Sequence, residues 1–377
     1  MDIEIDGDFP GGNIEVERID GSEIFFHQQL RDTTRDWFYW CLRLRASAGK
    51  DLHFNFTKSR ALGVRGPAVS TDEGITWSWL GAETVHDNDF AYTMPENPLE
   101  VRLSFAMPYL ESHWQRFVNN LNHPELLIQR TLCKTAGGRD VHYALFGNLG
   151  REPDHRVAIT CRHHCCEMMA NDALEGIISW TLNDSGKDAR WLREHARFFA
   201  VPFVDKDGVE NGDQGKGRHP RDHGRDYEGE SLYASTAAIR KLVPDWGEGK
   251  LHLALDLHCP HISGPHNEVI YLVGSQQEAI DQEQRRFGKL LESVNEGQLP
   301  FHAENFLPFG TSWNTGDNYG GGKSFSRWAA EIPSIALSTG IEIPYANASD
   351  TEVNQESARS FGEDLGRAIA SYLQQLS

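Results

Sequence analysis

The stretch that decides the fold of the second half of the chain is RVAITCRHHCCEMMANDALEGIISWTL, residues 156–182. Its first five residues form a short apolar run rich in β-branched side chains, which is typical of a buried strand. From Glu167 the sequence EMMANDALEGIISWTL indicates a helix that follows the strand directly. A strand that leads straight into a helix is the repeating unit of an α/β domain.

The chain on both sides of this stretch continues the alternation. Further strands are expected at residues 196–204, 251–258, 268–274 and 334–343, and helices at residues 277–294 and 356–376. Upstream, residues 127–147 indicate two strands joined at Gly137-Gly138. We therefore predict a largely parallel or mixed sheet with helices on both faces.

The first third of the chain has a different pattern. Short stretches such as DLHFNFT and VRLSFAM alternate apolar and polar residues between turns, which predicts antiparallel β-structure. The period becomes helical at Leu110, Trp114 and Phe117, so the domain junction is placed there. A typical domain size of roughly 100 to 200 residues favours two domains for a chain of this length. We predict an N-terminal antiparallel β-sandwich over residues 1–107 and an α/β domain over residues 108–377.

The composition excludes several classes of protein. A formal net charge of −19 argues against a nucleic-acid binder, because phosphate backbones are bound by surfaces rich in Lys and Arg. No apolar run approaches the roughly 18 to 20 residues of a membrane-spanning helix, so no membrane partner is expected. The acidic N-terminus lacks a secretory signal and the six cysteines are few, so we expect a cytoplasmic protein with reduced thiols. Residues 216–225, KGRHPRDHGR, predict one positive patch.

His164 and Glu167 stand where the strand gives way to the helix. Zinc binds imidazole nitrogen and carboxylate oxygen at about 2.0–2.2 Å, and such a turn can bring residues three apart to one ion. Of the 17 histidines, only His164 has a Glu three residues on. One match of this kind is expected by chance, so a helix-start Glu beside a strand-end His stays open as the alternative.

The segment LHLALDLHCPH, residues 251–261, is an apolar strand that ends in Asp256, Leu257 and His258. Side chains two apart on a strand share a face, so Asp256 and His258 are expected to project together where open α/β sheets bind ligands. His258 would complete a His/Glu/His set, the arrangement of catalytic zinc. Alternatively, His258 is a satisfied strand-end histidine, and Asp256 either supports a ligand or is a surface carboxylate.

Five blocks occur in a specific order: ITCRHHCCEMMANDALEGIISWTL, VPFVDKDGVENG, RDHGRDY, LALDLHCPH and STGIEIPYA. Together they resemble the zinc carboxypeptidases related to carboxypeptidase A, and most closely the cytosolic carboxypeptidase subfamily. Members of that subfamily carry a β-sandwich ahead of the catalytic domain, with segments like Trp37-Phe38-Tyr39 and Pro108-Tyr109. The resemblance spans nearly the whole chain, and the order of the blocks is more specific than any one of them.

The resemblance implies the central residues of the site. His164, Glu167 and His258 fall on the zinc ligands, and Glu342 falls on the glutamate that acts as general base. A carboxylate beside the metal can take a proton from water and pass it to the leaving amine. Glu331 is the nearest competitor for this role, and Glu342 is preferred because it ends an apolar run.

The resemblance implies less about the residues that bind substrate. The Asn-Arg pair that holds the substrate's C-terminal carboxylate falls on Gly224-Arg225, so the arginine is kept and the amide is missing. The arginine that stabilises the oxyanion falls near Lys216 and Arg218, and the spacing does not decide between them. Tyr319 lies close to the position of the mobile tyrosine of the carboxypeptidase A branch. For the basic residues 216–225, a solvated loop is the alternative.

Specificity is predicted from the loop ahead of Glu342, which carries Lys323 and Arg327. A guanidinium there would favour an acidic C-terminal side chain, whereas a surface pair between Arg327 and Glu331 is the alternative. Cys165 and Cys166, between two of the ligands, are not predicted to bind metal, because three protein ligands suffice for a catalytic site.

The sequence thus predicts a zinc-dependent carboxypeptidase that removes C-terminal residues from peptides or protein tails. Two other functions stay open. One is a zinc amidohydrolase of the same scaffold that deacylates a small N-acyl amino acid, although such relatives are expected to lack the N-terminal sandwich. The other is a peptide-binding relative with weakened catalysis, which the glycine at position 224 suggests.

Overall fold

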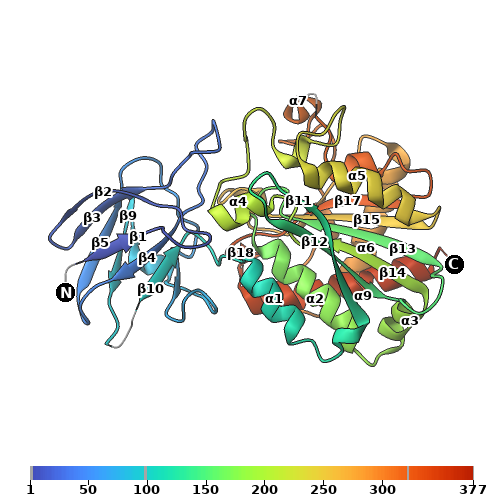
Figure 1. Cartoon of the computed structure of the whole chain (residues 1–377), viewed down its shortest axis with the longest axis horizontal. Coiled ribbons are helices and arrows are strands. Elements are labelled where there is room, and N and C mark those ends of the chain that lie inside the picture. The colour runs from blue at the N-terminus through green and yellow to red at the C-terminus, as the bar shows by residue number, and fades with distance from the viewer. Residues whose placement is uncertain (1–2, 97–99, 321, 377) are drawn as a thin grey trace.

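The computed structural model describes residues 3–96, 100–320 and 322–376, arranged as two parts side by side (Figure 1). The strands of the N-terminal part are β1 (Glu4–Asp6), β2 (Glu15–Asp20), β3 (Glu23–His27), β4 (Cys41–Arg45), β5 (Asp51–Phe56), β6 (Ala68–Ser70), β7 (Ser78–Trp79), β8 (Val85–His86), β9 (Asp89–Thr93) and β10 (Val101–Ser104). They form two five-stranded sheets, ordered β1-β4-β10-β6-β7 and β2-β3-β5-β9-β8. The predicted sandwich is therefore present.

The pairing within the sandwich differs from the prediction at one place. All pairs are antiparallel except β3 and β5, which run parallel. Its core is aromatic: Phe54 and Phe90 stack with ring centroids 4.7 Å apart, and Phe26 meets Trp40 edge to face at 5.6 Å. The pattern of β5 accounts for this core. Its apolar residues are buried and alternate with polar ones, so they all point to the same face of the sheet.

The C-terminal part is built on a seven-stranded sheet with the order β11-β12-β14-β13-β15-β17-β16. Its strands are β11 (Leu127–Lys134), β12 (Asp140–Gly147), β13 (His155–Cys161), β14 (Ala196–Val201), β15 (Leu251–His258), β16 (Tyr271–Val273) and β17 (Leu337–Glu342). Strands β14, β13, β15 and β17 are parallel, and the other three pair antiparallel at the edges. The prediction of a mixed sheet is confirmed.

Helices cover both faces of this sheet. They are α1 (Glu111–Asn119), α2 (Met169–Asn183), α3 (Lys187–His195), α4 (Lys206–Asn211), α5 (Ala234–Gly247), α6 (Glu278–Val294), α7 (Gly316–Tyr319), α8 (Phe325–Ala329) and α9 (Gln355–Gln374). Helices α2 and α9 pack against one face and α5 and α8 against the other (Figure 1). A short hairpin, β18 (Asn347–Ala348) with β19 (Thr351–Glu352), precedes α9.

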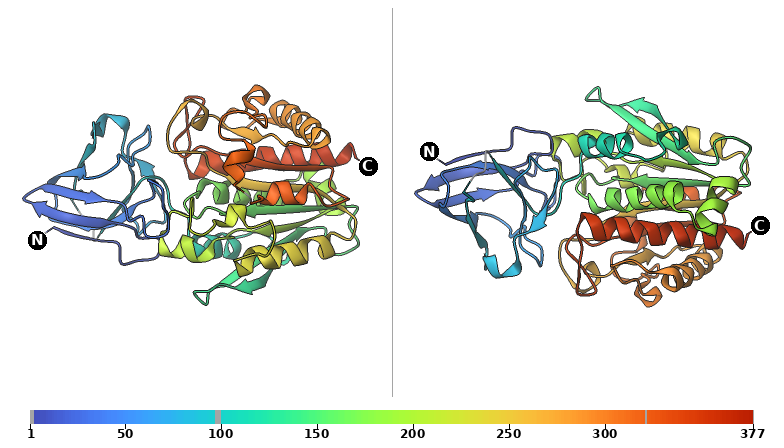
Figure 2. Two further views of the ribbon diagram at one scale, coloured as in Figure 1. Left: turned by 90° about the horizontal axis from the view of Figure 1, so that it is seen from above. Right: turned by 90° about the horizontal axis from the view of Figure 1, so that it is seen from below.

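The two parts share a hydrophobic core. The Phe38 ring lies 5.6 Å from that of Tyr345, and the Phe105 ring lies 5.0 Å from it, so aromatic residues of the sandwich pack on the segment after β17. The sandwich lies at the end of the molecule opposite to the C-terminus (Figure 2). Among the described residues, no helix is both long and apolar enough to cross a membrane.

Candidate active site

The turn between β13 and α2 carries the first two candidate ligands. Arg162 adopts a left-handed backbone conformation with φ 62°, which lets the chain reverse direction directly after the strand. Its buried guanidinium donates to Cys165 O at 2.8 Å and to Tyr109 O at 2.9 Å. These contacts hold the turn and so place the backbone of His164 and Glu167.

His164, Glu167 and His258 converge at the carboxyl end of the sheet. The Nδ1 atom of His164 lies 2.9 Å from Glu167 Oε1, and the Nδ1 atom of His258 lies 2.6 Å from Glu167 Oε2. All three residues are buried, and their candidate donor atoms lie within 4.8 Å of one another. Two imidazole nitrogens and a carboxylate are the donor set of a catalytic zinc site.

The outer nitrogens of the two imidazoles each face a carboxylate. His258 Nε2 lies 2.8 Å from Asp256 Oδ2, and His164 Nε2 lies 3.6 Å from Asp222 Oδ1. At His258 the carboxylate is within hydrogen-bond distance, so it orients the ring and selects the tautomer that leaves Nδ1 free for a metal ion. His164 Nε2 is too far from Asp222 for a hydrogen bond and has no such partner among the described residues. The cluster therefore fits a divalent cation held through the two Nδ1 atoms and Glu167.

Asp256 is the centre of a buried hydrogen-bond chain. Its Oδ1 lies 2.8 Å from His163 Nδ1 and accepts a bond from Thr160 Oγ1 at 2.8 Å, and His163 Nε2 lies 2.8 Å from the Tyr227 hydroxyl. Burial alone would raise the pKa of Asp256, but the facing imidazoles of His163 and His258 hold that pKa well below its ordinary value. Asp256 thus stays ionised behind His258.

A second grouping of possible ligands, His163 with Asp256 and His258, lies in the same place. Its members already satisfy one another: His163 is bonded through both ring nitrogens, and Asp256 through both oxygens. Glu167 differs because both of its oxygens face Nδ1 atoms and it also lies 3.4 Å from Lys216 Nζ. Burial would raise the pKa of Glu167, yet the facing His164, Lys216 and His258 hold that pKa well below its ordinary value.

Glu342 lies beside the ligand cluster, as the sequence suggested. It ends β17 and is directly opposite His258 of β15 in the strand register. Its buried Oε2 atom has no hydrogen-bond partner within the described part of the chain. Burial raises the pKa of Glu342. Glu331, the competing candidate, is exposed and pairs with Lys323 at 2.7 Å, which places it outside the site.

A cavity of about 320 Å³ opens beside Glu342. Its lining combines cationic and aromatic side chains, namely Arg35, Trp37, Lys216, Arg225, Tyr271 and Trp313. Arg35 and Trp37 belong to the N-terminal part, so both parts of the chain border the site. A smaller adjoining pocket is lined by His164, His258, Tyr319, Ser326 and Glu342, among others.

Arg218, one of the two candidates for the cation that faces the oxyanion, lies among carboxylates. Its guanidinium is held by three carboxylates, at 2.6 Å from Asp205, 3.4 Å from Asp32 and 3.4 Å from Asp213. An arginine engaged in this way is part of the framework, and Arg218 does not line the small pocket at Glu342. Lys216 does line that pocket, so of the two candidates it is the cation that faces the ligand cluster.

The packing around Gly224 explains why the expected amide is absent. A Cβ atom at this position would lie 2.7 Å from His164 Nε2, so any side chain would displace a ligand imidazole. Arg225 beside it lines both cavities, and its Nη1 donates to Gly224 O at 2.9 Å.

Tyr319 lies between two guanidinium groups. Its ring centroid is 4.7 Å from the Arg225 guanidinium carbon and 4.2 Å from that of Arg327, and its hydroxyl donates to Asn314 Oδ1 at 3.1 Å. Arg327 donates to Gln276 Oε1 at 2.9 Å and does not pair with Glu331. The alternative of a surface pair is therefore wrong for Arg327, but Ser326 rather than Arg327 lines the small pocket.

Sequence reasoning missed several residues of this site. His163, Asp222 and Tyr227 were not singled out, although all three lie in the quoted sequence blocks. Arg35 and Trp313 come from segments with no motif, and Trp37 was quoted only for the resemblance and not as a site residue. The thiols of Cys165 and Cys166 face Asp213 O and the Tyr345 hydroxyl, at 3.0 and 3.8 Å, which agrees with leaving them out of the ligand set.

No family model matches the chain. One curated protein, an uncharacterized protein from Zymomonas mobilis, is 25% identical over 215 residues, which is 55% of this chain and 55% of that protein. The chain thus spans about half the length of the curated relative that it matches.

Solved structures match over the full length. A metallo-carboxypeptidase from Burkholderia cenocepacia superposes with a TM-score of 0.81 at 20% identity and covers 100% of both chains. A metallo-carboxypeptidase from Pseudomonas aeruginosa, in complex with (2-guanidinoethylmercapto)succinic acid, has a TM-score of 0.78 at 18% identity, over 99% of this chain and 100% of that chain. The carboxypeptidase A of Helicoverpa armigera matches 72% of this chain and 74% of its own, with a TM-score of 0.51 at 13% identity. In fold, including the N-terminal sandwich, this chain resembles the bacterial metallo-carboxypeptidases.

Proposed function

We propose that this chain is a zinc-dependent carboxypeptidase of the cytosolic type, which hydrolyses C-terminal residues from peptides or protein tails. The observation that carries the proposal is the convergence of His164 Nδ1 and His258 Nδ1 on the two oxygens of Glu167, with the unpartnered Glu342 Oε2 beside them. The similarity of both parts of the chain to metallo-carboxypeptidase structures supports it.

His164, Glu167 and His258 would hold the zinc ion. When bound there, zinc would polarise the carbonyl of the scissile peptide bond and increase the acidity of a water molecule. Glu342 Oε2 takes a proton from that water and transfers it to the leaving amine. The raised pKa of this buried carboxyl suits a group that must both accept and donate a proton. Lys216 faces the negative charge that develops on the carbonyl oxygen.

Arg225 is the proposed partner of the substrate's terminal carboxylate. It lines the cavity beside Glu342, and Gly224 leaves its guanidinium without the usual neutral neighbour. The Pseudomonas aeruginosa protein binds a ligand whose name includes succinic acid, a dicarboxylic acid. A planar guanidinium can bind one carboxylate through two hydrogen bonds. We therefore propose that the free carboxylate of a peptide enters this cavity.

A preference for acidic C-terminal side chains is part of the proposal. Arg327 forms no ion pair with any carboxylate of the described residues, and its guanidinium stacks on Tyr319, which lines the small pocket. Lys323 is neutralised by Glu228 and Glu331 at 3.0 and 2.7 Å and is not proposed to contact substrate. Arg225 and Lys216 add positive charge around the pocket of an otherwise acidic protein.

The alternatives make different predictions for turnover. A deacylase would cleave N-acyl amino acids faster than peptides, and a binding relative would turn over neither. The complete ligand set and the free carboxylate of Glu342 favour an enzyme. We also propose a cytoplasmic location, which fits the six free cysteines.

The test is a turnover screen with the purified protein, with and without added zinc and a chelator. Peptides that differ only in their last residue, and a set of N-acyl amino acids, are the substrates, and mass spectrometry identifies the products. Loss of single C-terminal residues in the zinc-loaded sample alone is the expected result. Cleavage restricted to N-acyl amino acids would replace this proposal with the deacylase function.

A further inference from the structure

The loop that carries Lys216 is clamped between the two parts of the chain. On one side it touches the ligand-bearing turn: a Cβ atom at Gly215 would lie 2.4 Å from Cys165 N, so loop and turn are in direct backbone contact. Gly212, Gly215 and Gly217 all have positive φ angles, 72°, 76° and 66°, which few other residues adopt without strain. The path of the loop is therefore specific.

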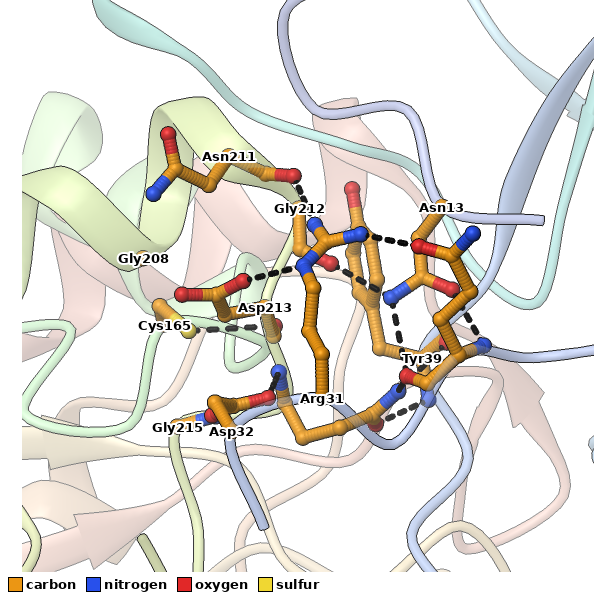
Figure 3. A network of polar contacts seen from close by, with 12 residues as sticks. Asn13, Arg31, Asp32, Tyr39, Cys165, Gly208, Asn211, Gly212, Asp213 and Gly215 are labelled. Carbon is orange, nitrogen blue, oxygen red and sulfur yellow. Dashed lines mark hydrogen bonds and ion pairs between the residues drawn. The ribbon is translucent and has the colours of Figure 1, made fainter. Parts of the chain in front are cut away.

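On the other side the loop is bonded to the N-terminal part (Figure 3). The Asn13 amide donates to Gly212 O at 2.7 Å, and Arg31 Nε donates to Asp213 Oδ1 at 2.8 Å. The side chain of Gln214 is fully buried and pairs with the Tyr39 backbone, accepting from its N–H at 2.7 Å and donating to its C=O at 2.8 Å. Consecutive residues of the loop thus each have a partner in the sandwich.

Asp32 makes the contact nearest to Lys216. Its Oδ1 accepts from Gln214 N at 2.9 Å, and its Oδ2 accepts from Gly215 N at 2.8 Å and lies 3.4 Å from Arg218 Nη2. The Asp32 side chain is only 7% exposed, so these bonds are shielded from water. The carboxylate therefore holds the N–H groups of the two residues before Lys216 and contacts an arginine after it.

Two neighbours of Asp32 hold Lys216 itself. Thr33 Oγ1 donates to Lys216 O at 2.7 Å, and the Trp37 ring centroid lies 5.7 Å from Lys216 Nζ. From this position Lys216 Nζ lies 3.4 Å from Glu167 Oε1 and 3.4 Å from His164 Nδ1. The backbone and the charged end of the lysine are thus both contacted by residues of the segment 33–37.

From this geometry we propose that Asp32 is a positioning residue, through which the N-terminal sandwich holds Lys216 over the ligand cluster. The proposal rests on the proposed function, in which Lys216 faces charge that develops during hydrolysis. It makes the sandwich a part of the active site rather than a separate module. Asp32 acts through the loop and does not itself contact substrate.

The variant that tests this is Asp32→Asn. The asparagine amide keeps the shape of the aspartate side chain but has only one acceptor oxygen. It can therefore accept from only one of the Gln214 and Gly215 N–H groups, and its NH₂ group would face the other. Asp36→Asn is the matched control, because Asp36 lies on the same segment and bonds Ser59 of the sandwich at 2.6 Å. Hydrogen exchange in the full-length protein should show faster exchange at the Gln214 and Gly215 amides in Asp32→Asn and no change there in Asp36→Asn.

Kinetics of the zinc-loaded enzyme provide the second measurement. A displacement of the order of 1 Å of a catalytic group costs up to about 10²-fold in rate, so kcat of Asp32→Asn is expected to fall by about 10- to 100-fold with zinc content unchanged. In a Lys216→Met background the same change should lower kcat by less than about 2-fold, because coupled residues are not additive.

Three results would overturn the proposal: unchanged exchange at the two loop amides, a wild-type kcat in Asp32→Asn, or equal losses of kcat in both backgrounds. Absence of all hydrolysis by the wild-type enzyme would instead refute the proposed function. In that case the hydrogen-exchange measurement by itself decides whether Asp32 holds the loop.

Discussion

The two sides of the active site are built in different ways. The ligand side lies on strand ends, where His258 and Glu342 are opposite each other in the register of β15 and β17. The cationic side, with Lys216 and Arg225, lies on irregular backbone between α4 and α5, and contacts with the N-terminal sandwich hold part of it. The candidate metal site is thus built on strand ends and the turn between β13 and α2, whereas the cationic side depends on contacts between the two parts of the chain.

The largest effect is expected on the ligand side. His164→Ala and His258→Ala should each lose stoichiometric zinc and with it all measurable hydrolysis, because a three-ligand site cannot lose a ligand and keep its geometry. Metal analysis after dialysis checks this, with His53→Ala as the control, since His53 is exposed on β5. Full zinc content in either ligand variant would show that the ligand assignment is wrong.

Glu342→Gln, also on the ligand side, should impair hydrolysis without impairing zinc binding. The amide cannot accept a proton, so kcat is expected to fall by about 10²- to 10⁴-fold while zinc content and folding stay unchanged. Glu331→Gln, a change of the same kind at an exposed position, is the control. An inactive control beside an active Glu342→Gln would move the general base to Glu331.

Arg225→Gln tests the cationic side, where the effect should appear in KM. A charge-assisted hydrogen bond contributes about 1.5–3 kcal/mol, which corresponds to about 10- to 150-fold in affinity for the substrate carboxylate. Zinc content should be unaffected, unlike in the ligand variants. Comparison of peptides with a free and an amidated C-terminus makes the test specific, because loss of discrimination between the two is expected only if Arg225 binds the carboxylate.

Asp256→Asn addresses the carboxylate behind His258. Residues that orient a metal ligand typically contribute 10- to 100-fold to metal affinity, so zinc binding should weaken by about that factor. Competition with a chromophoric chelator measures it without any need for activity. Wild-type affinity in this variant would mean that the β15 backbone alone orients the imidazole.

The smallest effect is expected for Arg327→Ala. It should reduce the ratio of kcat/KM for peptides ending in Glu over those ending in Leu by a few-fold, because Arg327 reaches the pocket through Tyr319 rather than directly. Equal rates for the two peptides in the wild type would refute the acidic preference. An unchanged ratio in the variant would exclude Arg327 as its source.

The ligand side could be predicted from the sequence because its information is local. Strand β15 ends in Asp256 and His258, and the spacing of His164 and Glu167 falls on a strand-to-helix junction. The environment of Arg218 could not be predicted in full, since one of its three carboxylates, Asp32, comes from the other part of the chain. The parallel pairing of β3 with β5 was also missed. Alternation of apolar and polar residues along a strand does not specify the direction of that strand relative to its neighbours.

The shared interface also has a consequence for the order in which the enzyme matures. Domains generally fold as units during synthesis, the N-terminal one first. The sandwich that bears Asp32 is therefore available as a template before residues 212–218 leave the ribosome, and the loop can form its contacts with Asn13, Tyr39 and Asp32 as it emerges. The last strand of the site, which carries Glu342, is made more than a hundred residues later. The contacts that place Lys216 can thus form before Glu342 is synthesised.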